Sequence, residues 1–158
     1  MSLDREIKIM NDANCFALSE AIDGSGANYN TVWGVIIGSG FGGSFVHNKK
    51  VVEGVNQVAG DWGHQPLPYP SKEEWDLNLK CPVDNCGRPL CAEQFISGIG
   101  FTKIFNKKYK TNFTTKEIVD LELNGDERAK KEFDLYEDRF ARLIACLLYT
   151  SDAADDAS

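Results

Sequence analysis

Residues 31–53 read TVWGVIIGSGFGGSFVHNKKVVE, and this stretch decides the fold class of the chain. Its first part, 31–37, is rich in β-branched and aromatic residues, and an extended pattern returns at 44–47 after a glycine-rich turn. A second tight turn at 48–49 leads into another extended segment at 50–53. The stretch therefore predicts a β-meander built from sequence neighbours.

Helical patterns and one long loop surround this meander. A short strand is expected at 7–10. The proline-rich stretch 54–90 has little periodicity and is predicted to be a long loop, which in ordered proteins is usually functional. Apolar residues recur at helical spacing in 91–109 and 126–145, which we expect to form helices. A helix is also expected at 13–21 from its composition, and another at 114–124, which starts with the capping box of Thr114 and Glu117 and stops at Asn124-Gly125.

The composition fits one globular domain. The chain has 158 residues, 42% of them apolar, and a net charge of −7, which excludes wholesale disorder and a disulfide-dense miniprotein. The acidic balance argues against nucleic-acid binding, and no apolar run is long enough to span a membrane. The first twenty residues lack the pattern of a secretory signal, so we expect a cytoplasmic protein with reduced cysteines.

A cysteine-rich stretch is the strongest local signal. His64 precedes Cys81, Cys86 and Cys91, and three thiolates with one imidazole form the ligand set of a closed tetrahedral zinc site. The alternative is that these are ordinary reduced cysteines in a loop. Three cysteines so close together in a reducing compartment favour a structural zinc ion.

The glycine-rich turn GSGFGG at 38–43 is the second signal. Gly38, Gly40 and Gly43 match the G-x-G-x-x-G pattern, but a strand follows them instead of a helix, so the context excludes a Rossmann site. The turn could still present backbone N–H groups and the Ser39 hydroxyl to a phosphate. A plain hairpin turn is the alternative, because glycine is the usual residue of tight turns.

Asn11 and Asp12 form the third signal, because they follow a predicted strand and precede a helix, where α/β proteins commonly bind ligands. Asp12 could there act as a general base toward an alcohol, with Asn11 orienting the hydroxyl. Helix capping is the alternative, and the spacing alone favours it. Asp61 and Glu93 are further carboxylates near the predicted metal ligands, although each alone is more often a solvated charge.

Four motifs in a fixed order carry a resemblance to a known family. They are NDANCFALSEA at 11–21, IIGSGFGG at 36–43, AGDWGHQPLPYP at 59–70 and CGRPLCAEQFISG at 86–98. Together they resemble the ROK family of bacterial sugar kinases over residues 7–145, and the third motif looks most like the fructokinase (mannofructokinase) branch. The resemblance implies an α/β, actin-like (ribonuclease-H-like) bilobal fold. It also implies ATP with Mg²⁺ as phosphoryl donor, a hexose as acceptor and a homodimer of full-length chains.

The resemblance assigns catalytic and phosphate-binding roles to single residues. Asp12 matches the catalytic base, and Asn11 matches a contact to a sugar hydroxyl. Gly38, Ser39 and Gly40 match the second phosphate turn of the family, in which threonine is usual at the serine position.

The sugar and metal roles follow from the later motifs. His64 matches a residue that both touches the sugar and binds zinc, and Glu93 matches a further sugar ligand. Asp61 stands where a sugar-binding glutamate is usual, so the shorter side chain weakens that contact. Cys86 and Cys91 fall on the C-G-x-x-G-C pattern of the zinc loop.

The chain departs from the family pattern in several places. Leu90 replaces the second glycine of the cysteine motif. The first cysteine of the family normally stands where this chain has Asp84, and we expect a longer loop to bring Cys81 to the metal, with Asp84 as the lesser candidate. Nothing in the chain resembles the N-terminal D-x-G-G-T turn or the late adenine-binding segment, so we expect an internal fragment that is inactive alone.

The resemblance also predicts how the chain is divided. Residues 1–30 would form the end of the N-terminal lobe with its hinge helix, and residues 31–145 would form part of the C-terminal lobe. The last stretch, CLLYTSDAADDAS at 146–158, has no periodicity and is similar to translated sequencing-adapter sequence. We therefore expect 146–158 to be a non-native tail.

These signals predict an ATP-dependent hexose kinase of the fructokinase kind, with Asp12 as base and a structural zinc ion. Two rivals stay open, a sugar-sensing transcriptional repressor of the same family and a zinc-stabilised carbohydrate-binding module. A D-x-G-G-T turn upstream would favour the kinase, and a basic helix-turn-helix would favour the repressor. The identity of the hexose is not readable, because discrimination among epimers depends on single hydrogen bonds.

Overall fold

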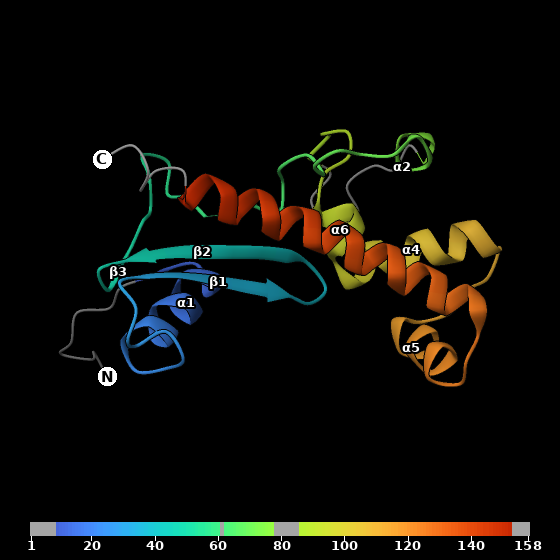
Figure 1. Ribbon diagram of the computed structural model, residues 1–158, viewed down its shortest axis with the longest axis horizontal. Helices are drawn as coiled ribbons and strands as arrows, with labels where there is room; N and C mark the ends of the chain where they lie inside the picture. Colours follow the sequence, from blue (N-terminus) through green and yellow to red (C-terminus); the bar gives the residue numbers. More distant parts are fainter. Residues whose placement is uncertain (1–8, 61, 78–85, 153–158) are drawn as a thin grey trace, which may run out of the picture. The chain divides into compact units, whose positions relative to one another are not determined.

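The computed structural model describes residues 9–60, 62–77 and 86–152 (Figure 1). Contacts divide the chain into two units, one formed by residues 1–36 and 42–62 and the other by residues 37–41 and 63–158. Each unit has a hydrophobic core of its own. None of the described helices combines the length and the hydropathy that crossing a membrane requires.

The described part of the first unit holds one helix and most of a three-stranded sheet in the order β1-β2-β3. Neighbouring strands run in opposite directions, and Val46 of β2 lies opposite Val51 of β3 (Figure 1). The predicted meander is confirmed, although the second strand begins three residues earlier than expected. The elements are α1 (Asp12–Ile22), β1 (Thr31–Ile37), β2 (Phe41–His47) and β3 (Lys50–Val51).

Small residues allow α1 to pack closely on the sheet. Ala17 and Ala21 of the helix are buried together with Val46. Gly34 of β1 leaves room for the helix, because a Cβ there would lie 2.6 Å from the Cβ of Ala17. Lys49 completes the contact by donating from its ammonium group to the Ala21 carbonyl, which lies in the last turn of α1. These contacts hold the middle and the end of α1 against the sheet.

The second unit is mostly helical, and its core lies where α4, α5 and α6 meet. Phe101, Phe105, Ile118 and Ala129 are buried in this core, and the ring of Phe101 contacts that of Tyr136 at 5.5 Å between centroids. Its helices are α2 (Lys72–Asp76), α3 (Glu93–Ile96), α4 (Gly98–Tyr109), α5 (Thr115–Leu123) and α6 (Glu127–Asp152).

The predicted helix at 91–109 is wrong in one respect, because the chain breaks it into α3 and α4 at Ser97. Ser97 has an extended backbone (φ −66°, ψ 150°), and its hydroxyl accepts a hydrogen bond from the Gly100 N–H at 3.0 Å. It therefore caps a new helix. The break also turns the Gly98 N–H toward another segment, the carbonyl of Gly38.

The two ends of α5 and the start of α6 agree with the sequence prediction. Thr114 and Glu117 form both hydrogen bonds of a capping box at the start of α5, and Gly125 follows its end with a left-handed backbone, φ +82°. The final helix continues through Cys146 to Asp152, beyond the expected end at 145. A non-native origin of 146–158 and the lobe boundary at residue 30 stay predictions.

The stretch expected to be one long loop contains the short helix α2. Ser71 and Glu74 form a capping box, and the Glu74 carboxylate then accepts hydrogen bonds from Arg139 and Arg142 of α6, both at 2.8 Å. Glu74 and Arg139 are only 3% and 2% exposed. Arg142 also donates to the carbonyl of Pro68 at 2.6 Å. These bonds tie the segment that follows His64 to α6.

Glu74 should contribute strongly to stability. Replacing it with glutamine should lower the free energy of unfolding by about 3 kcal/mol, because Arg139 would keep a buried charge without a carboxylate. Urea unfolding followed by circular dichroism measures the loss. The neighbouring Glu73 is an exposed carboxylate paired with Lys108, so Glu73→Gln should cost about 1 kcal/mol or less. Equal losses in the two variants would contradict a buried ion pair.

The same carboxylate should make stability depend on pH. Burial alone would raise the pKa of Glu74, but hydrogen bonds from Arg139, the Ser71 N–H and Arg142 outweigh it and hold the pKa below its ordinary value of 4.5. The contribution of Glu74 to the free energy of unfolding is therefore complete above the ordinary pKa of 4.5. It is lost as the pH falls through the lower pKa of the folded state. The difference in free energy of unfolding between the wild type and Glu74→Gln should therefore become smaller as the pH is lowered. A difference that does not change with pH would contradict this account.

Candidate functional site

Two segments of the second unit pair and bring His64 beside Cys91. The segments are 63–67 and 90–93, and a β-bridge joins Pro66 to Cys91. Backbone hydrogen bonds run from Leu67 N–H to Leu90 O (2.8 Å), from Ala92 N–H to Gln65 O (2.9 Å) and from Glu93 N–H to Gly63 O (2.9 Å). The pairing joins residues more than twenty positions apart and ends at Glu93, the first residue of α3.

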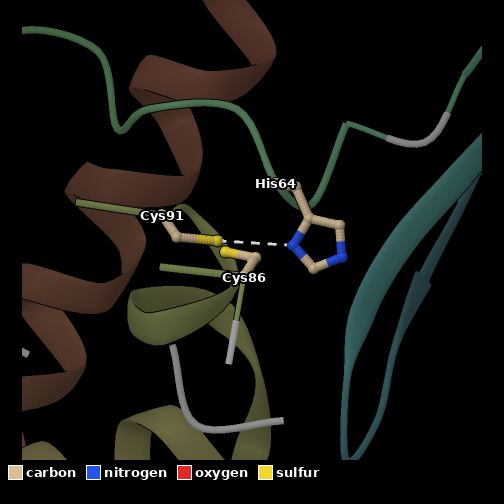
Figure 2. Close-up of side chains that lie close together, drawn as sticks. All are labelled: His64, Cys86 and Cys91. Atoms are coloured by element: carbon tan, nitrogen blue, oxygen red, sulfur yellow. Dashed lines mark hydrogen bonds between the residues drawn. The ribbon is translucent and has the colours of Figure 1, made fainter. Parts of the chain in front are cut away.

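His64, Cys86 and Cys91 form a compact group of possible metal ligands (Figure 2). The Nδ1 atom of His64 lies 3.5 Å from the Sγ atom of Cys91, and one ligand atom from each residue lies within 4.8 Å of the others. Cys91 is buried, and the His64 side chain is 28% exposed. The group therefore has an inner side in the protein and an outer side open to a ligand.

These three residues fit zinc. With Zn–S bonds of about 2.3 Å and Zn–N bonds of about 2.0–2.1 Å, ligand atoms at the corners of a tetrahedron lie about 3.4–3.8 Å apart. The observed His64–Cys91 distance of 3.5 Å falls in this range. Cys81 and Asp84, the two candidates for the fourth ligand, lie outside the described residues, as does Asp61.

The loop between the cysteines uses left-handed backbone at two positions. Gly87 has φ +70° and Leu90 has φ +55°. Both positions carry glycine in the family pattern quoted above, which agrees with the ease with which glycine adopts positive φ. Leu90 adopts the same conformation with its side chain buried, so the substitution keeps the geometry of the loop at some cost in strain.

The glycine turn is held by the segment that follows the cysteines. The Phe41 N–H donates to Oε1 of Glu93 at 3.3 Å, and the Gly98 N–H donates to the carbonyl of Gly38 at 2.8 Å. The Gly38 N–H is itself bonded to the carbonyl of Gly40. Among the four consecutive N–H groups of 38–41, the middle two, of Ser39 and Gly40, are the ones that could face a phosphate.

An apolar pocket lies beside this turn. Its volume is about 270 Å³. Gly38 and Gly98 form part of its wall, and aromatic side chains including Phe101, Phe133 and Tyr136 form much of the rest. A flat, weakly polar ring system is the kind of group that such a lining accepts.

Asn11 and Asp12 belong to the first unit. Asn11 is the N-cap of α1, and its Oδ1 accepts a hydrogen bond from the Ala13 N–H at 2.8 Å. This is the capping role that the spacing favoured. Asp12 is the first residue of the helix, and its exposed carboxylate also accepts from the Ala13 N–H at 2.8 Å. Asp12 is thus held at a defined place while it stays open to solvent.

Comparison with known proteins identifies the family. A family model described as the ROK family matches residues 1–154. The chain belongs to the ROK family. It is 37% identical over 150 residues to N-acetyl-D-glucosamine kinase of Escherichia fergusonii. The aligned residues make up 95% of this chain and 50% of that protein. The ROK chain thus spans about half the length of the curated relatives it matches.

Solved structures agree with this assignment. The ROK hexokinase of Thermus thermophilus matches with a TM-score of 0.65 and 25% identity over 77% of this chain and 39% of that one. A ROK family transcriptional regulator, a homologue of the Escherichia coli MLC protein, matches with a TM-score of 0.68 and 19% identity over 87% of this chain and 35% of that one. The resemblance and the actin-like α/β fold class are confirmed, while the fructokinase branch stays a prediction.

One contact that shapes the site was not predicted from the sequence. The resemblance assigns Glu93 to the sugar and the glycine turn to the phosphate, and it does not relate the two. Gly40 and Gly98 were the available signal, because a Cβ on Gly40 would lie 2.9 Å from Oε1 of Glu93 and one on Gly98 would lie 3.0 Å from the carbonyl of Gly38. A side chain at Gly98 would press on the Gly38 backbone, and one at Gly40 would displace the Glu93 carboxylate, so glycine favours the close approach of the two segments.

Proposed function

We propose that this ROK chain is part of an ATP-dependent kinase that transfers the γ-phosphoryl group to a hydroxyl of a hexose. One observation carries the proposal. The buried carboxylate of Glu93 lies between His64, at 3.7 Å from its Nδ1, and the glycine turn, at 3.3 Å from the Phe41 N–H. A residue that the family resemblance assigns to the sugar is thus next to the turn that it assigns to the phosphates.

The donor nucleotide would bind at the glycine turn. The N–H groups of Ser39 and Gly40 and the Ser39 hydroxyl would donate hydrogen bonds to phosphate oxygens, and the apolar pocket beside Gly38 would receive the base. Bound Mg²⁺ neutralises phosphate charge in reactions of this class. Because these groups act mainly by positioning, the turn must keep its conformation when the nucleotide arrives.

The acceptor sugar would be bound by Asn11, Asp61, His64 and Glu93. Asp12 would take the proton from the accepting hydroxyl as its oxygen attacks the γ-phosphorus. The bond from the γ-phosphorus to the bridging oxygen of ADP breaks, and the proton remains on Asp12 until it is released to solvent. The exposed position of the Asp12 carboxylate supports this role, since a substrate must be able to reach it.

A zinc ion would be held by His64, Cys86, Cys91 and a fourth ligand, for which Cys81 is the first candidate. When bound, it would act structurally by fixing the loop between the cysteines to α3. The chemistry of the two thiols and one imidazole supports zinc over a hard cation such as Mg²⁺, because Mg²⁺ prefers oxygen ligands.

The sugar that best fits the relatives is an N-acetylated hexosamine. The E. fergusonii protein, 37% identical to this chain, is named an N-acetyl-D-glucosamine kinase, whereas the fructokinase prediction rested on the 59–70 motif alone. We therefore place N-acetylglucosamine before fructose as substrate.

A kinase assay on the full-length gene product tests the proposal. ADP release would be measured with ATP and, separately, N-acetylglucosamine, fructose, mannose and glucose. We expect sugar-dependent release that is highest with N-acetylglucosamine. Highest activity with fructose would restore the fructokinase branch, and sugar binding with no ADP release would favour a regulator or a carbohydrate-binding module.

A further inference from the structure

Glu93 contacts the metal-ligand group and the glycine turn with different oxygens of one carboxylate. It is the first residue of α3, and the residue is 5% exposed. Oε1 accepts the hydrogen bond from the Phe41 N–H, and Oε2 lies 3.7 Å from Nδ1 of His64. Rotation of the carboxylate would therefore change its contacts on both sides at once.

The glycine turn is also held at its other end by the same segment. The Gly98 N–H donates to the Gly38 carbonyl at 2.8 Å, and the absence of a side chain at Gly40 allows Oε1 of Glu93 to approach. The conformation of 38–41 thus depends on where α3 and the start of α4 hold Glu93 and Gly98. A small displacement of Glu93 would release one of the two anchors.

We propose that Glu93 is a positioning residue that couples metal binding at His64, Cys86 and Cys91 to the conformation of the glycine turn. The inference rests on the proposed function for the role of that turn. Metal bound at the three ligands would fix the His64 ring and the residues just before α3. Glu93, the first residue of α3, would thereby be held with Oε1 aimed at the Phe41 N–H. The turn would then be ordered for phosphate before any nucleotide binds.

Amide hydrogen exchange measured by NMR on the 158-residue chain tests this coupling directly, with and without one equivalent of zinc. In the wild type, zinc should slow exchange of the Phe41 amide by about tenfold, as expected when a hydrogen bond to a charged group becomes persistent. Glu93→Gln keeps an acceptor oxygen and the size of the side chain but removes the charge. Because a neutral amide oxygen is a weaker acceptor than a carboxylate, Phe41 should exchange faster than in the wild type and should show only a small part of the zinc response.

Two further variants complete the test. Glu93→Ala should speed Phe41 exchange with and without zinc, whereas Glu137→Ala, which removes an exposed carboxylate of α6, should behave as the wild type. Zinc content after dialysis should stay near one per chain in all of them, because the three ligands are untouched. Should the alanine variant fail to fold, the glutamine variant alone decides.

The proposal is overturned if zinc fails to bind the wild type, if it leaves Phe41 exchange unchanged there, or if Glu93→Gln shows the full zinc response. None of these measurements uses sugar or nucleotide. A failure of the coupling therefore leaves the kinase assay to be judged by itself, and a failed kinase assay leaves the coupling intact.

Discussion

Replacing Asp12 with asparagine in the full-length protein should lower the turnover of the proposed kinase reaction by about 10²- to 10⁴-fold, the usual contribution of a general base. Asparagine keeps the size and the hydrogen-bonding oxygen of the side chain but cannot take up the proton of the attacking hydroxyl. Sugar binding should weaken far less than turnover. Steady-state kinetics, with sugar affinity measured by calorimetry, would separate the two effects.

A matched variant distinguishes catalysis from helix capping at this position. Asp23 is an exposed aspartate at the other end of α1, and Asp23→Asn should leave turnover unchanged. If Asp12 acts only as an acidic residue of the first turn, its replacement should cost about 0.3–1 kcal/mol of stability and no activity. Near-normal turnover of Asp12→Asn would move the base elsewhere and leave capping as its role.

Replacing Cys86 with serine should release zinc from the chain. A structural zinc site contributes a binding free energy on the order of 10 kcal/mol or more that is coupled to folding. The serine variant should therefore fall from about one bound zinc per chain to nearly none after dialysis, and zinc should no longer raise its melting temperature. Metal analysis and thermal unfolding with added zinc measure the two effects.

Cys15→Ser is the control for this experiment, because Cys15 is an exposed cysteine of α1. It should retain zinc as the wild type does. Cys86→Ser is the sharper single variant, since Cys91 is fully buried and its replacement would also disturb packing. Stoichiometric zinc in the Cys86→Ser, Cys91→Ser double variant would exclude this metal site.

The parts of the fold with local causes were predictable. The turn at Asn48 and Lys49 has positive φ at both residues, 49° and 61°, which is the geometry of a two-residue hairpin turn. The start of α5 depends on Thr114 and Glu117, three residues apart. In each case the residues that form the local structure are neighbours in the sequence, so the sequence pattern predicts the structure directly.

The parts that depend on distant residues were not predictable. The break at Ser97 leads into Gly98, which bonds to the carbonyl of Gly38, sixty positions earlier. The short helix α2 buries Glu74 because Arg139, 65 positions later, provides a charge for it. Periodicity within a window of residues contains no information on either partner.

The candidate site shows the same division. Residue types alone indicated His64, Cys86 and Cys91, and the structure brings these three together. The contact between Glu93 and Phe41 joins residues 52 positions apart and uses the backbone N–H of Phe41. No pattern of side chains in the sequence therefore indicates it. The positions of Asp61 and Cys81 in the site stay predictions, because both lie outside the described residues.

The central claim is that a phosphoryl group moves from ATP to a hexose. Phosphorus NMR of the full-length protein, incubated with ATP and equal amounts of N-acetylglucosamine, fructose, mannose and glucose, tests it most directly. We expect one phosphomonoester signal, that of phosphorylated N-acetylglucosamine, to grow as the γ-phosphate signal of ATP declines. The amount of phosphomonoester formed should equal the amount of ATP consumed. An unchanged ATP spectrum in the presence of zinc-loaded protein that still binds a sugar would contradict the claim.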